Sequence, residues 1–253
     1  MKIAVLVKQT PQLSEVSWGD DGLKWADDAL VVNPFDEYAV EEAIRIKEKS
    51  GGTAVALTFG GANSAAVLRD VLALGIDEAF LVKSDDYSTT DPQHNGRVLA
   101  ACIRKIGDID LVLTGKSAAD DDSGIVGPSV AAHLGWPQIS YVRKFDKIES
   151  ATIVAWRTTD YGHDVVETSL PAVCSVVKEI NEPRLPSLKG KMKAKKAEIT
   201  IFTPEDLGIA SKPTIEIKSV SAPPARPKGE ILKGELDEVV DALIKKLKGD
   251  KLI

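Results

Sequence analysis

The chain has 253 residues, of which 43% are hydrophobic and 28% charged, an ordinary balance for a globular protein. Its formal net charge of −6 provides no general attraction to nucleic acid or to an anionic membrane surface. The two cysteines, Cys102 and Cys174, lie far apart, which argues against a disulfide scaffold or a zinc ribbon and suits a reducing compartment.

The N-terminal segment, MKIAVLVKQTP, predicts a first β-strand over residues 3–7. Its apolar run is shorter than the roughly 7–15 residues of a signal-peptide core. No run in the sequence approaches the ~20 apolar residues that span a bilayer. We therefore expect a cytoplasmic protein with no membrane insertion, or a mitochondrial-matrix protein if the source is eukaryotic.

Helical patterns then alternate with short apolar runs, and glycines end the helices. The predicted strands cover residues 3–7, 54–59, 79–83 and 110–114, and the predicted helices cover residues 36–49, 64–74, 96–106 and 125–134. Strands with near-continuous apolar runs are buried on both faces of a sheet. The fold class is therefore α/β, with a doubly wound, mostly parallel, Rossmann-like sheet.

After residue 137 the pattern changes to shorter predicted strands. They cover residues 139–142, 152–156 and 165–168, and an apolar run follows at residues 172–177. From residue 181 the sequence becomes basic and is predicted to be extended, with a short helix opening at Thr203 or Pro204 and an amphipathic helix over residues 236–247. We therefore divide the chain into an α/β domain, residues 1–180, and a C-terminal arm, residues 181–253. Such an arm usually packs on a partner chain; the alternative is that it wraps its own domain.

The loop GKSAADDDSGIVGP follows the strand predicted to end at residue 114. Ligands of open α/β sheets bind at the carboxyl ends of strands, and the N–H groups of the next helix form an anion site. One of the three consecutive aspartates is placed to cap that helix. Another is placed to accept hydrogen bonds from ribose hydroxyls or to pair with Lys116.

Three interpretations of this loop stay open on chemistry alone: an acidic cap without a ligand, a nucleotide phosphate site, and a metal site. The spacing does not match a P-loop, a GxGxxG fingerprint or an EF-hand. No other residues converge to make a metal site, so we expect none. The three histidines are dispersed and form no catalytic triad pattern.

A second candidate is the sequence VVNPFDEYAVEEA, in which Asp36 is placed to cap a helix that begins near Glu37. In a doubly wound sheet this turn and the acidic loop can share one edge with Phe59 and Leu6, which end two other strands. These segments together have the polar and apolar groups that would enclose an adenine.

Several motifs occur in a characteristic order: NPFDEYAVEEAIRIKEK, GKSAADDDSGIVG followed by WPQ, LPAV, NEPRLPSLKGKMKAKK and TPEDLGI. In this order they resemble the β subunit of electron-transfer flavoprotein, over nearly the whole chain. The resemblance implies a heterodimer with an α subunit that carries the redox FAD. It also implies a buried adenine nucleotide, usually AMP, in the β subunit. The nucleotide contacts carried over are Leu6, Asn33, Pro34, Phe35, Asp36, Phe59, Gly115, Lys116, Ser117, Ala118, Ala119, Asp120, Asp121, Asp122, Ser123, Gly124, Ile125 and Val126.

The sequence departs from the family at Gly124, Ile125 and Val126, where many members have Asn-Gln-Thr. These residues cannot donate side-chain hydrogen bonds to a phosphate, so backbone N–H groups would hold it. The VGP that follows resembles electron-bifurcating members, in which the β subunit binds a second FAD. We favour AMP, with a second FAD as the alternative. A further alternative is a stand-alone universal-stress-type nucleotide-binding protein, which normally lacks the arm.

The resemblance also implies a recognition loop after NEPR, in which an exposed leucine docks on flavin dehydrogenases of the acyl-CoA dehydrogenase type. The predicted docking residues are Arg184, Leu188, Lys189 and Lys191. Electrons would then pass through the α-subunit FAD to a quinone-linked acceptor. We therefore expect an electron-carrier subunit with no catalytic residues of its own.

Overall fold

The computed structural model describes residues 1–253 except residues 20–21, 27–28, 88–90, 211, 216 and 225–227. The chain divides into two compact units, Met1–Ser219 and Val220–Ile253. The first unit contains a central sheet of nine described strands in the order β11-β10-β9-β12-β8-β1-β6-β7-β13. All neighbours from β9 to β13 pair in parallel, and β10 pairs antiparallel with β9 and β11. The doubly wound α/β prediction is confirmed.

The parallel part of the sheet contains seven strands. Their bounds are β1 Lys2–Leu6, β6 Thr53–Gly60, β7 Glu78–Lys83, β8 Leu111–Gly115, β9 Gln138–Ile148, β12 Ala172–Val176 and β13 Thr200–Phe202. The antiparallel extension consists of β10 Thr152–Thr159 and β11 Gly162–Ser169. These two strands and β9 are longer than the sequence pattern predicts. Two small strand pairs lie outside the sheet: β2 Gln9–Pro11 with β5 Leu30–Val32, and β3 Ser17–Gly19 with β4 Gly22–Lys24.

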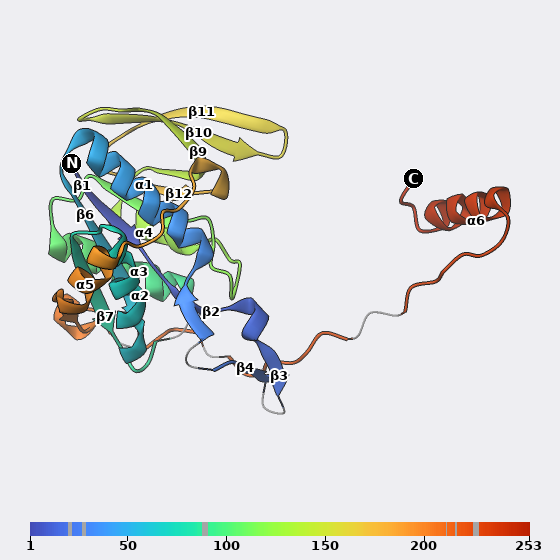
Figure 1. Ribbon diagram of the computed structural model, residues 1–253, viewed down its shortest axis with the longest axis horizontal. Helices are drawn as coiled ribbons and strands as arrows, with labels where there is room; N and C mark the ends of the chain where they lie inside the picture. The colour runs from blue at the N-terminus through green and yellow to red at the C-terminus, as the bar shows by residue number, and fades with distance from the viewer. Residues whose placement is uncertain (20–21, 27–28, 88–90, 211, 216, 225–227) are drawn as a thin grey trace. The chain divides into compact units, whose positions relative to one another are not determined.

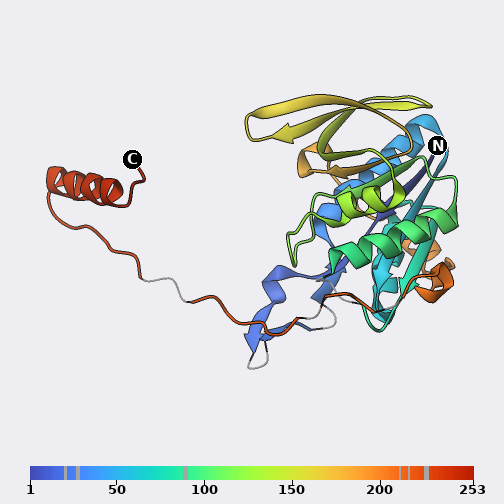
Figure 2. The ribbon, with the colours of Figure 1, turned by 180° about the vertical axis from the view of Figure 1, so that it is seen from behind.

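Helices cover both faces of the sheet, as Figures 1 and 2 show from opposite sides. On one face, α1 Pro34–Ser50, α2 Ala65–Leu74 and α5 Leu188–Lys196 pack on one buried core. On the other face, α3 Pro92–Ile106 and α4 Val126–Leu134 pack on a second core. The strand side chains alternate between them: Ile3 and Val5 of β1 join the first core, and Ala4 and Leu6 join the second. This period of two explains why the buried strands are apolar at every position.

The sequence predicts an extended segment from residue 181, but the structure has helix α5 within it. Ser187 accepts a hydrogen bond from the N–H of Gly190 (3.0 Å) and so caps helix α5. Helix α5 packs on α2, where the Arg69 guanidinium donates to the carbonyl of Ala194 (2.9 Å). A β-carbon at Gly190 would lie 2.2 Å from the carbonyl oxygen of Ala73. Only glycine therefore permits this close approach of the two helices.

The chain continues along the same unit beyond α5. Strand β13 pairs with β7, and the ring of Phe202 stacks on that of Phe80 with centroids 6.4 Å apart. The Asp91 carboxylate then accepts hydrogen bonds from the N–H groups of Thr214 (2.6 Å) and Ile215 (3.2 Å). The division between the compact units therefore does not coincide with the boundary expected between residues 180 and 181.

The second unit contains helix α6, Leu236–Gly249. Its bounds agree closely with the predicted helix at residues 236–247. The expected short helix near residue 203 is a single 3-10 turn, Glu205–Leu207. Both cysteines are fully buried, with Cys102 in the core under α3 and Cys174 in the core under α1.

Candidate functional site

A cavity opens where the carboxyl ends of β1, β6 and β8 meet. The empty space of the cavity, counted with the open solvent at its mouth, is about 670 Å³. Its position follows the rule that open α/β sheets bind ligands beyond the carboxyl ends of their strands. The residues that line it are Leu6, Val7, Lys8, Asn33, Asp36, Leu57, Phe59, Tyr87, Asn95, Leu99, Thr114, Gly115, Lys116, Ser117, Ala118, Asp121, Ser123, Gly124, Ile125, Val126 and Gly127.

Asp36 joins two strand ends at the floor of this cavity. Its carboxylate accepts hydrogen bonds from the N–H of Lys8 (2.8 Å), just after β1, and from the N–H of Gly115 (3.1 Å), at the end of β8. The prediction that Asp36 caps α1 is wrong. The helix already begins at Pro34, with Asn33 before it, because proline is well suited to the first position of a helix.

The pKa of Asp36 is raised to about 7. Burial is the main cause, and it outweighs the hydrogen bonds from Lys8, Asn33 and Gly115, which lower the pKa. A carboxyl with this pKa is partly protonated at neutral pH. The junction between the two strand ends is therefore sensitive to pH in the physiological range.

Asn33 holds the acidic loop against the start of α1. Its side-chain amide donates to the carbonyl of Ser117 (2.9 Å), and its side-chain oxygen accepts from the N–H of Ala119 (3.0 Å). Only 1% of Asn33 is exposed, so these bonds satisfy a buried amide. Asn33 therefore shapes the loop that a ligand would meet.

The three aspartates of the loop have partners within the chain, and the expected contact of one of them with ribose hydroxyls stays a prediction. Asp120 and Asp121 pair with the Lys8 ammonium group, at 2.7 Å and 3.5 Å. Asp122 accepts from the Ser117 hydroxyl (2.6 Å). The expected cap is wrong, because α4 starts after Ile125 with no side-chain cap.

Pairing of Lys116 with one of these aspartates was one of two alternatives, and the structure gives Lys116 a different partner. Its ammonium group lies 4.7 Å from the centroid of the Phe35 ring, a cation–π distance. A β-carbon at Gly115 would lie 2.6 Å from the backbone carbon of Phe35 and 2.5 Å from an Asp36 oxygen. The close contact of β8 with the start of α1 therefore requires glycine at position 115.

The start of α4 lines the cavity with residues 125–127, and no side chain caps its first backbone N–H groups. Gly124, just before it, has a φ of +63°, which glycine adopts readily. A β-carbon there would also lie 3.1 Å from the carbonyl oxygen of Lys116. These backbone donors and the helix dipole suit an anionic group such as a phosphate.

Most of the predicted nucleotide contacts line the cavity. Five do not: Pro34 and Phe35 lie at the start of α1, and Ala119, Asp120 and Asp122 lie in the loop, where they make the contacts described above. Sequence reasoning missed a further set of lining residues, namely Val7, Lys8, Leu57, Tyr87, Asn95, Leu99, Thr114 and Gly127. Asn95 was missed because the pattern places the start of α3 at Gly96, four residues after its true start at Pro92.

Aromatic residues form one wall of the cavity. The rings of Phe59 and Tyr87 meet edge to face, with centroids 5.0 Å apart, and the His94 ring lies 6.0 Å from that of Phe59. Burial, with the carboxylates of Asp120, Asp121 and Asp36 as further causes, raises the pKa of Tyr87 far above its usual value. Its hydroxyl is therefore protonated at physiological pH. Within the described residues, no cluster of His, Cys, Asp or Glu has the arrangement of a metal site.

The predicted docking residues fall on α5 and the segment before it. Leu188 begins α5 and is 78% exposed, and Lys189 and Lys191 follow it on the same helix. Leu188 and Lys189 share a shallow apolar depression with Met192, Lys193 and Lys196. Arg184 differs from the other predicted docking residues because its guanidinium forms ion pairs with Glu41 and Glu48 of the same chain.

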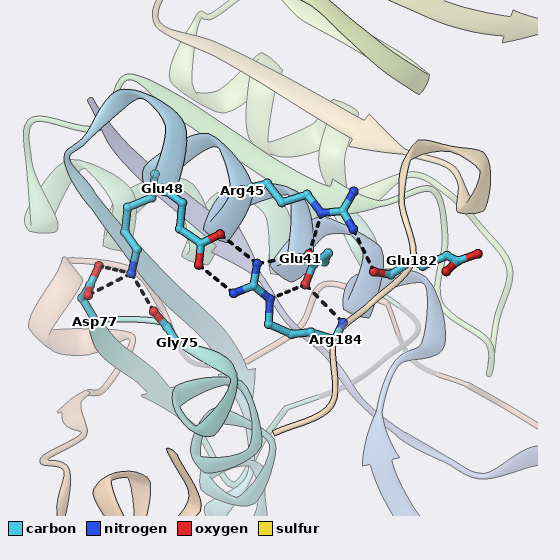
Figure 3. Close-up of polar contacts among 8 residues, drawn as sticks. Glu41, Arg45, Glu48, Gly75, Asp77, Glu182 and Arg184 are labelled. Carbon is cyan, nitrogen blue, oxygen red and sulfur yellow. Dashed lines mark hydrogen bonds and ion pairs between the residues drawn. The ribbon is translucent and has the colours of Figure 1, made fainter. Parts of the chain in front are cut away.

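Figure 3 shows this ion-pair network between α1 and the segment before α5. The Arg184 guanidinium donates to the buried Glu41 (2.8 Å) and to Glu48 (2.7 Å), and Arg45 also donates to Glu41 (2.6 Å). Burial raises the pKa of Glu41, but the bonds from Arg184 and Arg45 outweigh it and hold the pKa below its usual value. The segment that leads to Leu188 is thus fixed to α1.

Comparison with known proteins identifies the family. The model of the electron transfer flavoprotein domain matches residues 23–207. The chain is 34% identical to an electron transfer flavoprotein subunit beta of Thermoanaerobacterium thermosaccharolyticum, over all of both chains. The chain belongs to the electron transfer flavoprotein β-subunit family.

Two other relatives of this flavoprotein family extend the comparison. The chain is 35% identical to subunit CarD of the caffeyl-CoA reductase–Etf complex of Acetobacterium woodii, over all of both chains. It is 34% identical to the electron transfer flavoprotein subunit beta of Bacillus subtilis, over 99% of this chain and 98% of the relative. Among the described residues, none of the helices has the length and apolar character needed to cross a bilayer.

The raised pKa of Asp36 predicts a pH-dependent stability. Because the folded-state pKa of Asp36, about 7, lies above its usual value near 3.8, the unfolded chain releases this proton at lower pH than the folded chain does. The free energy of unfolding of wild type therefore falls as pH rises from about 4 to about 7. The side chain of Asp36→Asn stays neutral at every pH. The free energy of unfolding of the variant should therefore increase relative to that of wild type across this window, by up to about 4 kcal/mol. Urea unfolding at a series of pH values measures this. Asp85→Asn, at an exposed position, is the control, and parallel curves for wild type and Asp36→Asn would contradict the prediction.

The Arg184 network predicts a contribution to the free energy of unfolding whose pH dependence is opposite to that of Asp36. Arg184→Gln removes the main partner of a buried carboxylate and should lower the free energy of unfolding at pH 7 by about 1–3 kcal/mol. We expect a smaller loss of stability than for a fully buried ion pair, because the Arg184 side chain is 34% exposed and Arg45 still pairs with Glu41 in the variant. Since the pKa of Glu41 is lowered, the loss should shrink as pH falls below its usual range. Arg143→Gln, exposed on β9, is the control, and equal losses for the two variants would refute the role of Arg184.

Proposed function

We propose that this chain is the β subunit of a heterodimeric electron-transfer flavoprotein and that it acts as an electron carrier subunit and not as an enzyme. An α subunit would bind the redox FAD, and this chain would complete the flavin environment. The family membership supports this role, as does the match to relatives named as subunits beta over the whole chain. The full-length match disfavours a stand-alone universal-stress-type protein.

We propose further that the cavity at the carboxyl edge of the sheet binds AMP as a structural cofactor. The observation that carries this proposal is the meeting of Asn33, Asp36, Phe59 and the loop at residues 115–126 around one cavity. The uncapped start of α4 provides backbone donors for the phosphate. The apolar walls near Leu6 and Phe59 suit a purine ring, which stacks on aromatic and aliphatic surfaces.

A second FAD in the same cavity is the alternative, and two observations favour it. Residues 126–128 are VGP, as in bifurcating members of the resembled family. One relative is named as a subunit of a caffeyl-CoA reductase–Etf complex. In that case the loop would hold a redox cofactor, and the chain would belong to an electron-bifurcating machine.

The proposed electron donors are flavin dehydrogenases of the acyl-CoA dehydrogenase type, which would place the protein in fatty acid oxidation with a quinone-linked acceptor. They would dock at Leu188, whose exposure and basic neighbours support this role. A small apolar anchor gives affinity, and surrounding charges speed encounter. A cytoplasmic location stays a prediction.

The nucleotide content of the heterodimer tests the cofactor proposal. The chain is expressed with its α partner, the purified complex is denatured, and the released nucleotides are quantified by chromatography. We expect one FAD and one AMP per heterodimer. Two FAD and no AMP would establish the bifurcating alternative, and one FAD with no adenylate would refute a nucleotide in this cavity.

The docking proposal predicts a loss of electron transfer on truncation of the anchor. Leu188→Ala should reduce the rate of electron transfer from an acyl-CoA dehydrogenase of the same organism by about tenfold or more at sub-saturating concentrations. Stopped-flow reduction of the α-subunit flavin measures this rate. Leu185→Ala, at a nearby residue that is 90% exposed, is the matched control. Equal rates for wild type and Leu188→Ala would overturn the docking role.

A further inference from the structure

The wall of the cavity formed by α3 contains a polar side chain that neither the motifs nor the family resemblance indicated. Asn95 lies in the first turn of α3 and lines the cavity together with Tyr87 and Leu99. Only 5% of Asn95 is exposed. A buried amide on the wall of a ligand cavity is well placed for recognition, because buried polar groups require hydrogen-bond partners.

The other buried polar side chains of the cavity are directed at the protein itself. Asn33 binds the backbone of the loop, Asp36 binds the N–H groups of Lys8 and Gly115, and the Thr114 hydroxyl donates to the carbonyl of Gly115 (2.9 Å). These groups shape the site but have their main hydrogen bonds within it. Asn95 is the other buried amide among the described lining residues, and it lies on the wall formed by α3.

Asn95 already has an interaction within the chain. A side-chain amide has two donor hydrogens and a two-lone-pair acceptor, so an internal contact leaves it capacity for a ligand.

The chemistry of an amide matches adenine. Asparagine places an acceptor and a donor side by side, and adenine places its exocyclic amine beside a ring nitrogen that accepts, so the two pair in a bidentate manner. The apolar residues Leu6, Leu57 and Phe59 line the same cavity and suit the faces of a purine ring. The cavity thus combines apolar surfaces for a base with one amide for its edge.

The position of Asn95 is fixed relative to the proposed phosphate site. The next residue, Gly96, packs directly on α4, where a β-carbon would lie 2.2 Å from the hydroxyl oxygen of Ser129 and 3.1 Å from its carbonyl carbon. Since the start of α4 lines the cavity, this contact joins the helix that carries the amide to the helix that carries the proposed anion site. A base and a phosphate of one nucleotide would therefore meet elements that are in direct contact.

We propose that Asn95 recognises the adenine base of the nucleotide in this cavity and sets the preference for adenine over guanine. This inference rests on the proposed nucleotide-binding function. It applies to AMP and to the adenine end of FAD alike, because both present the same base edge. Asn95 is thus a specificity-determining residue of the cofactor site.

The test compares wild type with Asn95→Asp in the full heterodimer. An aspartate accepts from the adenine amine but repels the neighbouring ring nitrogen, whereas it pairs with the N1–H and exocyclic amine of guanine. We expect Asn95→Asp to weaken AMP binding by about tenfold or more and to shift the AMP-to-GMP preference toward GMP. Calorimetric titration of nucleotide-stripped heterodimer with AMP and with GMP measures both effects, and chromatography of the denatured complex separates AMP from FAD.

Two controls separate base recognition from structural damage. Asn63→Asp makes the same chemical change at an exposed asparagine outside the cavity and should bind AMP as wild type does. A second measurement needs no variant: wild type should bind purine ribonucleoside 5′-monophosphate, which lacks the amine, about tenfold more weakly than AMP. The measurement with the amine-free analogue stays informative if Asn95→Asp folds poorly.

The outcomes distinguish this inference from the function on which it rests. Wild type that neither retains nor binds an adenine nucleotide would overturn the proposed function and this inference together. Wild type that binds AMP, with an unchanged AMP-to-GMP ratio in Asn95→Asp, would overturn the inference alone. Equal affinity of wild type for AMP and the amine-free analogue would likewise overturn it.

Discussion

The carboxylate of Asp36 is the interaction on which the rest of the site depends. It ties the end of β1 to the end of β8 through the N–H groups of Lys8 and Gly115, and these two strands are neighbours in the sheet. Burying a carboxyl is costly unless hydrogen bonds satisfy it, and here the partners are backbone groups that cannot be lost by side-chain substitution. The cavity, the loop and the start of α1 are all arranged around this junction.

Helix α1 connects the two proposed activities of the chain. Its first turn contributes Asp36 to the cavity, and its later turns contribute Glu41 and Glu48 to the bonds that hold Arg184. The segment before Leu188 is therefore fixed to the same helix that supports the cofactor loop. Because a helix with a buried apolar stripe is stiff, the docking residues have a defined position relative to the cavity without any direct contact with it.

Much of the fold was predictable from the sequence because strand and helix periods are local signals. The buried parallel strands and the glycine-terminated helices follow from patterns within a few residues. The role of Asp36 was not predictable in this way, since its partners lie 28 and 79 residues away and local rules favour a helix cap. The contribution of Asn95 was missed because α3 starts at Pro92, and helix α5 was missed because its Ser187 cap stands in a lysine-rich run.

The burial of both cysteines gives the chain an experimental advantage. Cys102 and Cys174 have no exposed surface, and burial raises the pKa of each thiol to about 12. A thiol needs access and a thiolate to react, so neither native cysteine should react with maleimide in the folded protein. A single cysteine introduced at an exposed position would thus be a unique attachment point for a spectroscopic label, with no need to remove the native residues first.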